Sequence, residues 1–402
     1  GRYVIIDRMI QVAVEHGAEA IHPGYGFVSE NPEFARRCRR AGIVFIGPEP
    51  ETMEVMGDKI SARRRMREAG VPVVPGTTEN LNSSEEAIDV CNRIGYPVML
   101  KASAGGGGKG MRLARKPEEV EEAFLAAKSE ALASFGDDTV YIEKFVVHPH
   151  HIEFQILGDR HGHVIHLCAR ECSVQRRNQK IVEETPSPFI SEALRRDMGE
   201  KAVAAAKAVN YVGAGTIEFL VDGDGNYFFL EMNTRLQVEH PITEEVLGID
   251  LVKEQIHIAN GRPLRLRQGD IIQRGHAIEC RICAEDTLAA FLPASGIVRQ
   301  FTEPHGIGVR MDSYVYEGYE IPVFYDPMIG KLIVWATCRE YAIERMRRVL
   351  FEYKITGVKT NIAYLRRIMA TPDFVTGGYD TGFVEKNVVF LRQVYDSRAE
   401  VC

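Results

Sequence analysis

Ten residues near the middle of the chain place a polar group at every second position. The stretch, residues 231–240, reads EMNTRLQVEH, and its polar residues alternate with Met, Thr, Leu and Val. Such alternation is typical of a strand that is buried on one face. The polar residues include carboxylates, amides and a guanidinium, which are groups that bind metal ions, bind anions and remove protons. The pattern therefore predicts a strand whose polar face carries a functional site.

A second carboxylate is predicted to face the first residue of this stretch. The preceding segment, GTIEFLVDGDGNYFFL, contains Asp-Gly, which is the favoured two-residue turn of a β-hairpin. A turn at Asp224 and Gly225 pairs Glu218 with Glu231. Like charges that stand directly opposite each other destabilise a sheet, and a divalent cation between them reverses the sign of that interaction. We therefore expect the pair to hold magnesium rather than to form a solvated edge.

The far end of the stretch is expected to bind a second ligand. In an extended chain Glu231 and Glu239 lie about 27 Å apart, at about 3.3 Å per residue, so one metal ion cannot serve both unless the chain bends back. Arg235 offers a planar fork to a carboxylate-like or phosphate-like anion, Gln237 can orient that anion, and Glu239 is a candidate base. The prediction is two adjoining sites, one for a metal and one for an anion.

A glycine-rich loop, AGGGGKG at residues 104–110, is predicted between two strands. It contains G-x-G-x-x-G, but a dinucleotide site requires a helix after the loop, and a P-loop requires Ser or Thr where Gly110 follows Lys109. With Lys101 on the entering strand, the arrangement indicates a flexible lid over nucleotide phosphates. A solvent-exposed flexible hairpin is the alternative interpretation.

Length and charge narrow the class of protein. The chain has 402 residues, enough for two or three domains, and its net charge of -7 argues against nucleic acid or an anionic membrane as the main partner. The basic clusters at residues 36–40 and 63–65 are expected on solvated helix faces. The sequence shows no apolar run of membrane-spanning length. The eight cysteines favour a reducing cytoplasm over a disulfide framework. Cys280 and Cys283, together with Cys168 and Cys172, leave a four-thiolate zinc site as a less favoured alternative to buried free thiols.

Helices and strands alternate along the first part of the chain, and short strands dominate after residue 270, so the fold class is α/β followed by α+β. The first strands alone cannot bury a core, so this domain is expected to be truncated at its N-terminus. Helices are expected at residues 3–17, 30–42, 48–69, 83–94, 117–134, 191–209 and 339–352.

Eight segments that occur in one order resemble the biotin carboxylase family of ATP-grasp enzymes over essentially the whole chain. These segments are HPGYGFVSENPEFA, MGDKISAR, GYPVMLKASAGGGGKGMR, SVQRRNQKIVEE, GAGTIEFL, EMNTRLQVEHPITE, GHAIECRICAED and YDPMIGKL. The resemblance implies an ATP-grasp fold with a truncated N-terminal Rossmann-like domain at 1–56, an ATP-grasp domain at 57–262 with a mobile lid at about 73–146, and an α+β C-terminal domain at 270–390.

The resemblance also implies a role for individual residues. The expected nucleotide contacts are Lys59, Lys101, Gly107, Gly108, Glu143, Lys144, Phe145, Val146, His151, Gln175, Asn178, Glu218 and Glu231. The expected metal ligands are Glu218, Glu231 and Asn233. The expected bicarbonate and biotin contacts are Lys180, Arg235, Gln237, Val238, Arg281 and Tyr25. Glu239 matches the general base and Arg281 the cation that stabilises the biotin enolate. Asn178 stands where the family often has His, and Cys283 where Asn is common.

The implied activity is ATP- and bicarbonate-dependent carboxylation of biotin through carboxyphosphate. It is the first half-reaction of carboxylases such as acetyl-CoA carboxylase, which serves fatty acid biosynthesis, although the residues leave the final carboxyl acceptor open. The expected cofactors are ATP and two Mg²⁺ or Mn²⁺ ions. The expected partners are a biotin carboxyl carrier protein and a carboxyltransferase on other chains or in flanking regions, and a second copy in a homodimer. The alternatives are another ATP-grasp carboxylate ligase, or a non-catalytic truncated chain that acts as an assembly partner.

Overall fold

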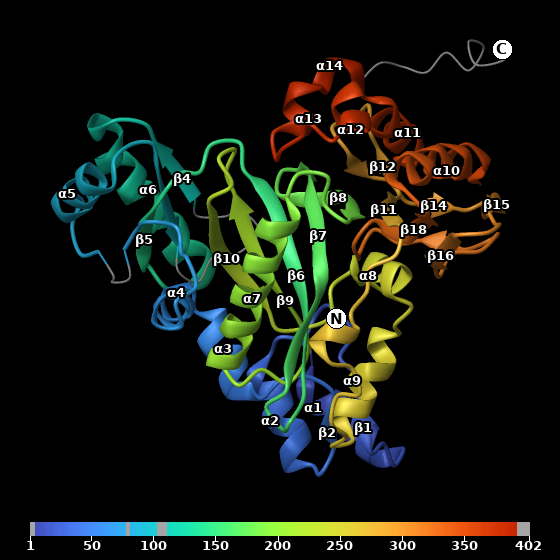
Figure 1. The fold of residues 1–402 in the computed structure, drawn as a ribbon, viewed down its shortest axis with the longest axis horizontal. Coiled ribbons are helices and arrows are strands. Elements are labelled where there is room, and N and C mark those ends of the chain that lie inside the picture. Colours follow the sequence, from blue (N-terminus) through green and yellow to red (C-terminus); the bar gives the residue numbers. More distant parts are fainter. Residues whose placement is uncertain (1–4, 78–80, 103–110, 392–402) are drawn as a thin grey trace. The chain divides into compact units, whose positions relative to one another are not determined.

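The computed structural model describes residues 5–77, 81–102 and 111–391 (Figure 1). The chain divides into two compact units. Unit 1 comprises residues 1–169, 190–240 and 250–271, and unit 2 comprises residues 170–189, 241–249 and 272–402. Gly107 and Gly108 lie outside the described residues. Within the described part of the chain, no helix is both long enough and apolar enough to cross a membrane.

The N-terminal part of unit 1 is a small α/β layer in which two strands pair in parallel. The helix predicted at 30–42 begins after Asn31, whose side chain caps it by accepting a hydrogen bond from the Phe34 N–H at 3.0 Å. The predicted single helix at 48–69 is wrong, because Asp58 leaves the helical conformation and caps a second helix by accepting from the Ser61 N–H at 2.7 Å. The elements are α1 (Ile6–Glu15), β1 (Ala20–Ile21), α2 (Pro32–Arg40), β2 (Val44–Phe45), α3 (Pro50–Gly57) and α4 (Lys59–Glu68).

A three-stranded antiparallel sheet with two helices follows within unit 1. Its order is β4-β3-β5, and α5 and α6 pack on it around a core that includes Leu100, Phe124 and Ile142. Its strands lie on either side of the glycine-rich segment, so the strands predicted there are confirmed. The elements are α5 (Ser84–Ile94), β3 (Val98–Ala102), β4 (Met111–Ala114), α6 (Val120–Phe135) and β5 (Val140–Lys144).

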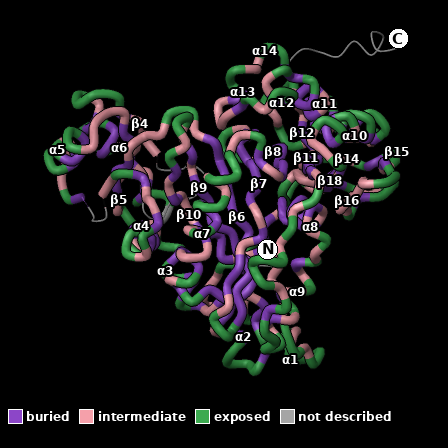
Figure 2. The backbone as a smooth tube through the Cα atoms, viewed as in Figure 1, coloured by how far each residue is buried: buried purple, intermediate pink, exposed green. Residues whose placement is uncertain are grey.

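The central strands of unit 1 carry the most deeply buried polar residues of that unit. Strand β6 is buried along all nine of its residues (Figure 2). Its apolar face includes Ile152 and Phe154, which lie opposite Phe219 and Ile217 of the neighbouring strand. Its other face is polar. The elements are β6 (His150–Gly158), the first residues of β7 (Val164–Arg176), α7 (Glu192–Ala208), β9 (Gly213–Val221), β10 (Tyr227–Asn233) and α9 (Leu251–Ala259).

Unit 2 is an α+β unit whose strands follow the order β7-β8-β11-β18-β16, with antiparallel pairing from β7 to β16. The predicted helix at 339–352 is confirmed residue for residue. Its main elements are β8 (Gln179–Thr185), α8 (His240–Leu247), β11 (His276–Cys283), β16 (Val309–Ser313), β18 (Met328–Ala336), α10 (Arg339–Glu352), α11 (Ile362–Ala370) and α12 (Pro372–Thr376).

A buried carboxylate ties three segments of unit 2 together. Glu184 is fully buried and accepts from His276 Nε2 at 2.5 Å, from Arg339 Nε at 2.8 Å and from the Tyr379 hydroxyl at 2.5 Å. Burial alone would raise the pKa of Glu184, but the hydrogen bonds and charges of His276 and Arg339 lower this pKa to about 2. The carboxylate is therefore ionised at neutral pH and depends on its donors.

We predict that Tyr379→Phe lowers the free energy of unfolding of unit 2 by about 1.5–3 kcal/mol, because the buried carboxylate loses one donor. Urea unfolding followed by the fluorescence of Trp335, which is the single tryptophan and lies in β18, measures this change. The control is Tyr341→Phe, since the Tyr341 side chain is exposed. Equal stability of the two variants would contradict the prediction.

Candidate metal and nucleotide site

Three glutamates stand in one row across β6, β9 and β10. Glu153 is the direct partner of Glu218, and Glu218 is the direct partner of Glu231, so their side chains share one face of the sheet. Glu153 and Glu218 are buried and Glu231 is half-buried. The predicted Glu218–Glu231 pairing is confirmed. Glu153 is not among the residues predicted from the sequence, although its position two residues after His151 on a strand places both side chains on one face.

The hairpin reaches this pairing by a route that differs from the prediction. The predicted two-residue turn is wrong, because the loop has three residues, 223–225, and closes with a hydrogen bond from the Asp222 N–H to the Asn226 carbonyl at 2.9 Å. The Asp222 side chain also accepts from the Asn226 N–H at 2.9 Å. The longer loop shifts the register by one residue, and a bulge at Leu230 shifts it back before the glutamate pair.

The predicted extended strand over 231–240 is also wrong beyond its third residue. Strand β10 ends at Asn233, and the chain turns before α8 begins at His240. As a result Gln237 Nε2 donates to Glu218 Oε1 at 2.8 Å, and Asn233 Nδ2 donates to the same oxygen at 2.9 Å. The bend therefore brings Gln237 onto the carboxylate pair and removes the wide separation that an extended chain would impose.

Glu30 holds this bend from a segment about 200 residues away in the sequence. Its carboxylate accepts from the Thr234 N–H at 2.9 Å and from Arg235 Nε at 2.8 Å. Arg235 also donates from Nη2 to Asn233 Oδ1 at 3.0 Å. The Thr234 N–H thus bonds to a side chain, beyond the last paired residue of β10, and Arg235 is fixed on two sides. Glu30 is not among the predicted site residues, although it lies in the segment HPGYGFVSENPEFA.

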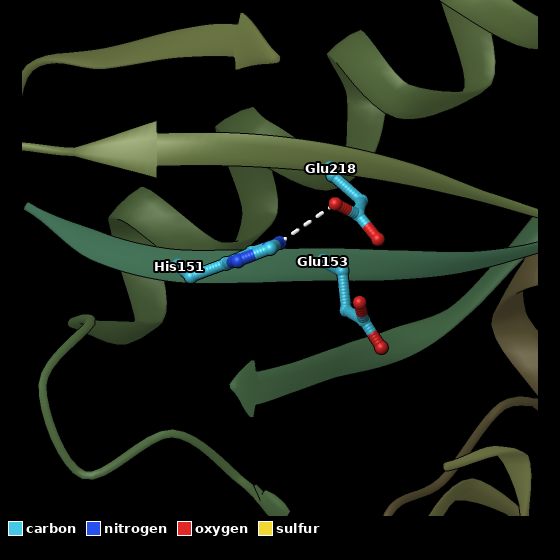
Figure 3. A group of neighbouring side chains, drawn as sticks. All are labelled: His151, Glu153 and Glu218. Atoms are coloured by element: carbon cyan, nitrogen blue, oxygen red, sulfur yellow. Dashed lines mark hydrogen bonds and ion pairs between the residues drawn. The ribbon is translucent and has the colours of Figure 1, made fainter. Parts of the chain in front are cut away.

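A histidine completes the polar face of β6. His151 Nε2 donates to Glu218 Oε2 at 2.8 Å (Figure 3). One ligand atom from each of His151, Glu153 and Glu218 lies within 4.8 Å of the others, which is a group that could hold a metal ion. Figure 3 shows that His151 and Glu153 come from one strand and Glu218 from the next. The oxygen donors of the row and of Asn233 fit the preference of Mg²⁺ for carboxylates and neutral oxygens.

Two lysines bring positive charge to the same face of unit 1. Burial lowers the pKa of Lys59, while the charges of Glu231 and Glu143 oppose this effect and that of Lys101 adds to it. Lys101 Nζ lies 2.5 Å from Glu143 Oε2. The structure therefore brings Lys59, Lys101, Glu143 and Glu231 into electrostatic contact, as expected for residues around nucleotide phosphates.

The expectation that residues 63–65 form a solvated basic face is wrong for Arg63. Arg63 is 2% exposed, and its guanidinium forms an ion pair with buried Glu143. A single-sequence pattern does not show this burial, because the partner lies eighty positions further along the chain. Arg64 and Arg65 are exposed, as expected.

The segment after β5 is fixed by neighbouring backbone. The Lys144 N–H donates to the Pro75 carbonyl at 2.7 Å, and the Phe145 N–H donates to the Pro97 carbonyl at 3.0 Å. Lys144 Nζ donates to the Gly95 carbonyl at 3.0 Å. Half-buried Val146 follows, so the predicted adenine segment is hydrogen-bonded to two other stretches of unit 1.

Of the remaining predicted site residues of this unit, Tyr25 is exposed, Val238 is half-buried and Glu239 is buried.

The other predicted site residues belong to unit 2. Lys180 and Arg281 line one open cavity with an empty volume of about 330 Å³, which Cys283 and Tyr364 also line. Arg281 Nε donates to Glu183 Oε1 at 2.7 Å, and Glu183 is fully buried. The structure thus brings Lys180 and Arg281 together on strands β8 and β11. Cys283 is a free thiol.

Gln175 and Asn178 differ in their surroundings. Gln175 is buried, and its Nε2 donates to the Cys172 carbonyl at 2.7 Å. Asn178 lies in the exposed turn between β7 and β8, where both Arg177 and Asn178 have positive φ values of 50° and 64°. Two such residues form the type I′ turn that suits a two-residue hairpin, and Asn tolerates this conformation well. A local reason for Asn at this position is therefore the turn itself.

The three-stranded sheet β4-β3-β5, the carboxylate row and the adjacent lysines define an ATP-grasp enzyme. Three family descriptions match the chain in order: biotin carboxylase, N-terminal domain, at 1–53; carbamoyl-phosphate synthase L chain, ATP binding domain, at 58–267; and biotin carboxylase C-terminal domain at 279–386. The predicted ATP-grasp fold is confirmed.

Curated relatives and solved structures agree with these matches. Biotin carboxylase of Nostoc sp. is 54% identical over 96% of this chain and 86% of its own length, and the chloroplastic biotin carboxylase of Arabidopsis thaliana is 53% identical over 96% and 72%. The biotin carboxylase domain dimer of Hydrogenobacter thermophilus 2-oxoglutarate carboxylase, solved with MgADP, ADP and bicarbonate, has a TM-score of 0.94 at 48% identity and covers 98% of this chain and 87% of that chain. A Campylobacter jejuni biotin carboxylase nucleotide complex has a TM-score of 0.93 at 47% identity, with 96% and 86% covered.

The chain belongs to the biotin carboxylase family. It is an ATP-dependent ligase that carboxylates biotin with bicarbonate and uses Mg²⁺, so the predicted class of enzyme and its cofactors ATP, Mg²⁺ and biotin are confirmed. Another ATP-grasp ligase activity is not favoured.

We predict that Glu218→Gln weakens the binding of Mn²⁺, used with ADP as a paramagnetic probe of the divalent cation, by at least about tenfold, because a direct ligand is lost. Electron paramagnetic resonance of free Mn²⁺ measures the affinity. The matched control is Glu121→Gln on the exposed face of α6, which should bind Mn²⁺ like the parent protein. Unchanged affinity in Glu218→Gln would exclude the row as the metal site.

Proposed function

We propose that the carboxylate row and the lysines of unit 1 bind the triphosphate of ATP together with two divalent cations. Glu218 and Glu231 would hold the first ion, and Glu231 and Asn233 the second. Mg²⁺ bound there neutralises phosphate charge and orients the γ-phosphate for attack. The observation that carries this proposal is the pairing of Glu153, Glu218 and Glu231 in one row, because three like charges at that spacing favour a bound cation.

The remaining predicted nucleotide contacts complete this proposal. Lys59 and Lys101 supply positive charge to the phosphates, and the segment from Glu143 to Val146 contacts the adenine. His151 donates to a metal-binding carboxylate in the structure, so its role includes fixing the position of Glu218. Gly107, Gly108, Gln175 and Asn178 are assigned to the nucleotide by family resemblance.

The residues after β10 are assigned to bicarbonate. Arg235 binds the anion with its guanidinium, and Gln237 and the backbone of Val238 orient it. Lys180 is assigned to bicarbonate by family resemblance. Bicarbonate is a poor nucleophile until it loses its proton, and Glu239 is the proposed base. Attack of the deprotonated oxygen on the γ-phosphate gives carboxyphosphate and ADP.

The carboxyl group then passes to biotin. Carboxyphosphate breaks down to carbon dioxide and phosphate, and the phosphate takes the proton from the ureido nitrogen of biotin. The resulting oxyanion requires a fixed cation, and Arg281 supplies it because Glu183 anchors its guanidinium on the wall of an open cavity. The ureido nitrogen then attacks the carbon of carbon dioxide, which forms the nitrogen–carbon bond of carboxybiotin. Tyr25 is the proposed biotin contact in unit 1.

The biotin in this reaction is proposed to be attached to a biotin carboxyl carrier protein, with a carboxyltransferase as the next enzyme. A Methanothermobacter thermautotrophicus relative named for pyruvate carboxylase and a Ruegeria pomeroyi propionyl-CoA carboxylase alpha chain support this setting and leave the acceptor, acetyl-CoA or another, undecided. A homodimer is proposed because the Hydrogenobacter thermophilus domain is described as a dimer. Relatives named chloroplastic and mitochondrial occur, so a cytoplasmic location of this protein stays a prediction. A role in fatty acid biosynthesis and the use of Mn²⁺ also stay predictions. The domains are proposed to span 1–56, 57–262 and 270–390.

Turnover tests the proposal directly. We expect ATP hydrolysis that requires bicarbonate and rises with free biotin, and we expect Glu239→Gln to lower kcat by about 10²- to 10⁴-fold with little change in KM for ATP, because only the proton transfer is lost. Phosphate release measures both. Exposed Glu192→Gln is the control. Activity that ignores biotin, or full activity in Glu239→Gln, would contradict the assignment.

The bend at Glu30 gives a second test. Glu30→Gln removes the charge that anchors Arg235, so KM for bicarbonate should rise by about tenfold, which corresponds to 1.4 kcal/mol, while the affinity for MgADP stays the same. Initial rates against bicarbonate concentration measure the change. Exposed Glu19→Gln serves as the matched control. A parallel loss of MgADP affinity would show that Glu30 supports the fold of the whole site instead.

A further inference from the structure

Arg63 is a buried cation that none of the proposed roles uses. It lies on α4 four residues after Lys59, so the two side chains share one face of the helix. The side chain of Arg63 is 3% exposed, whereas Arg64 and Arg65, the next residues on the helix, are exposed. A fully buried guanidinium is costly unless it is paired and hydrogen-bonded, so its contacts define what it does.

The contacts of Arg63 lie on β5 and on residues 74–76, which precede the three-stranded sheet β4-β3-β5. Nη1 pairs with Glu143 Oε1, and Nη2 donates to the Val74 carbonyl at 2.5 Å. The guanidinium also lies 5.7 Å from the centre of the Tyr141 ring. A Cβ on Gly76 would lie 3.1 Å from Nη2 and 2.3 Å from a backbone oxygen of β5, so the space beside the guanidinium is filled. Arg63 is therefore held in one position by β5 and by residues 74–76.

The carboxylate of Glu143 is shared between two cations. Its Oε1 pairs with Arg63 and its Oε2 lies 2.5 Å from Lys101 Nζ. Burial alone would raise the pKa of Glu143, but the charges of Lys101 and Arg63 lower it, so the carboxylate stays ionised. The side chain of Lys101 is 14% exposed against 3% for Arg63, so Lys101 is the more accessible of the two cations.

The pairing of Glu143 with both cations matters because Lys101 has two possible anionic partners, Glu143 and the nucleotide phosphates. The proposed function assigns Lys101 to the nucleotide phosphates, but in the structure its ammonium sits on Glu143. If Lys101 were the only counter-ion, its move to a phosphate would leave a buried carboxylate without a cation, which is strongly unfavourable. A second, immobile cation on the other carboxylate oxygen removes this conflict.

We propose that Arg63 is a positioning residue for nucleotide binding: it keeps the buried charge of Glu143 neutralised, so that Lys101 is free to bind the phosphates of ATP. This inference rests on the proposed function, because that function places Lys101 on the phosphates. Its consequence is selective. Ligands that carry phosphate bind Lys101, so their affinity depends on Arg63. Adenosine has no phosphate, so its affinity does not depend on Arg63.

Nucleotide affinities test the inference without turnover. In Arg63→Met, which keeps an unbranched apolar side chain but removes the guanidinium and its charge, we expect the Kd for MgADP to rise by about ten- to a hundredfold and the Kd for adenosine to change by less than about twofold. Isothermal titration calorimetry measures both. Arg64→Met, one residue along the same helix and exposed, is the matched control and should bind both ligands like the parent. Arg63→Lys should recover part of the MgADP affinity.

A double variant distinguishes two causes of weaker MgADP binding, the unpaired buried charge of Glu143 and a loss of folded structure. In a Glu143→Gln background the buried charge is already gone, so adding Arg63→Met should change the Kd for MgADP much less than it does in the parent protein. Because both members of this comparison carry Gln at position 143, any contact of that residue with the adenine is held constant. Equal loss of adenosine and MgADP affinity in Arg63→Met, or an equal effect of Arg63→Met with and without Glu143→Gln, would overturn the inference. Failure of the proposed function would be seen separately, as a parent protein that binds MgADP but shows no bicarbonate-dependent hydrolysis.

Discussion

Repulsion between the carboxylates of one row governs the architecture of the unit 1 site. Three glutamates at neighbouring positions on three strands cannot all be ionised and buried without compensation. The structure supplies hydrogen-bond donors to the central carboxylate: the side chains of Asn233 and Gln237 both donate to one oxygen of Glu218, and His151 donates to the other. The early end of β10 and the bend after it follow from this requirement, since an extended strand would carry Gln237 away from Glu218.

The same solution recurs at other buried glutamates of the described units. Glu184 collects donors from three segments of unit 2, and Glu143 shares its oxygens between an arginine and a lysine of unit 1. In each case the donors come from parts of the chain that are far apart in sequence. Buried carboxylates therefore connect segments in this protein, and each connection also fixes a side chain that the proposed chemistry uses or that stabilises the unit.

Local signals in the sequence were sufficient for some of this arrangement. The helix predicted at 30–42 is α2, which Asn31 caps, because the start of a helix depends on neighbouring residues only. The pairing of Glu218 with Glu231 was predicted from a two-residue turn that the structure does not have, and it holds because the three-residue loop and the bulge at Leu230 offset each other. The bend could not be read from EMNTRLQVEH, since its anchor is Glu30 in a distant segment. The burial of Arg63 was hidden for the same reason. The bend after β10 and the burial of Arg63 both depend on contacts between remote segments, and the pattern of neighbouring residues in a single sequence does not show such contacts.

The bulge at Leu230 has a consequence for how this site tolerates change. The three-residue loop at 223–225 and the bulge displace the register by one residue in opposite directions, so the pairing of the two strands is offset at the hairpin tip and back in step at the glutamates. The register at the glutamate pair is therefore independent of the register at the hairpin tip. Insertion or deletion of one residue in the loop can be offset by gain or loss of the bulge, so the pairing of Glu218 with Glu231 does not depend on one loop length.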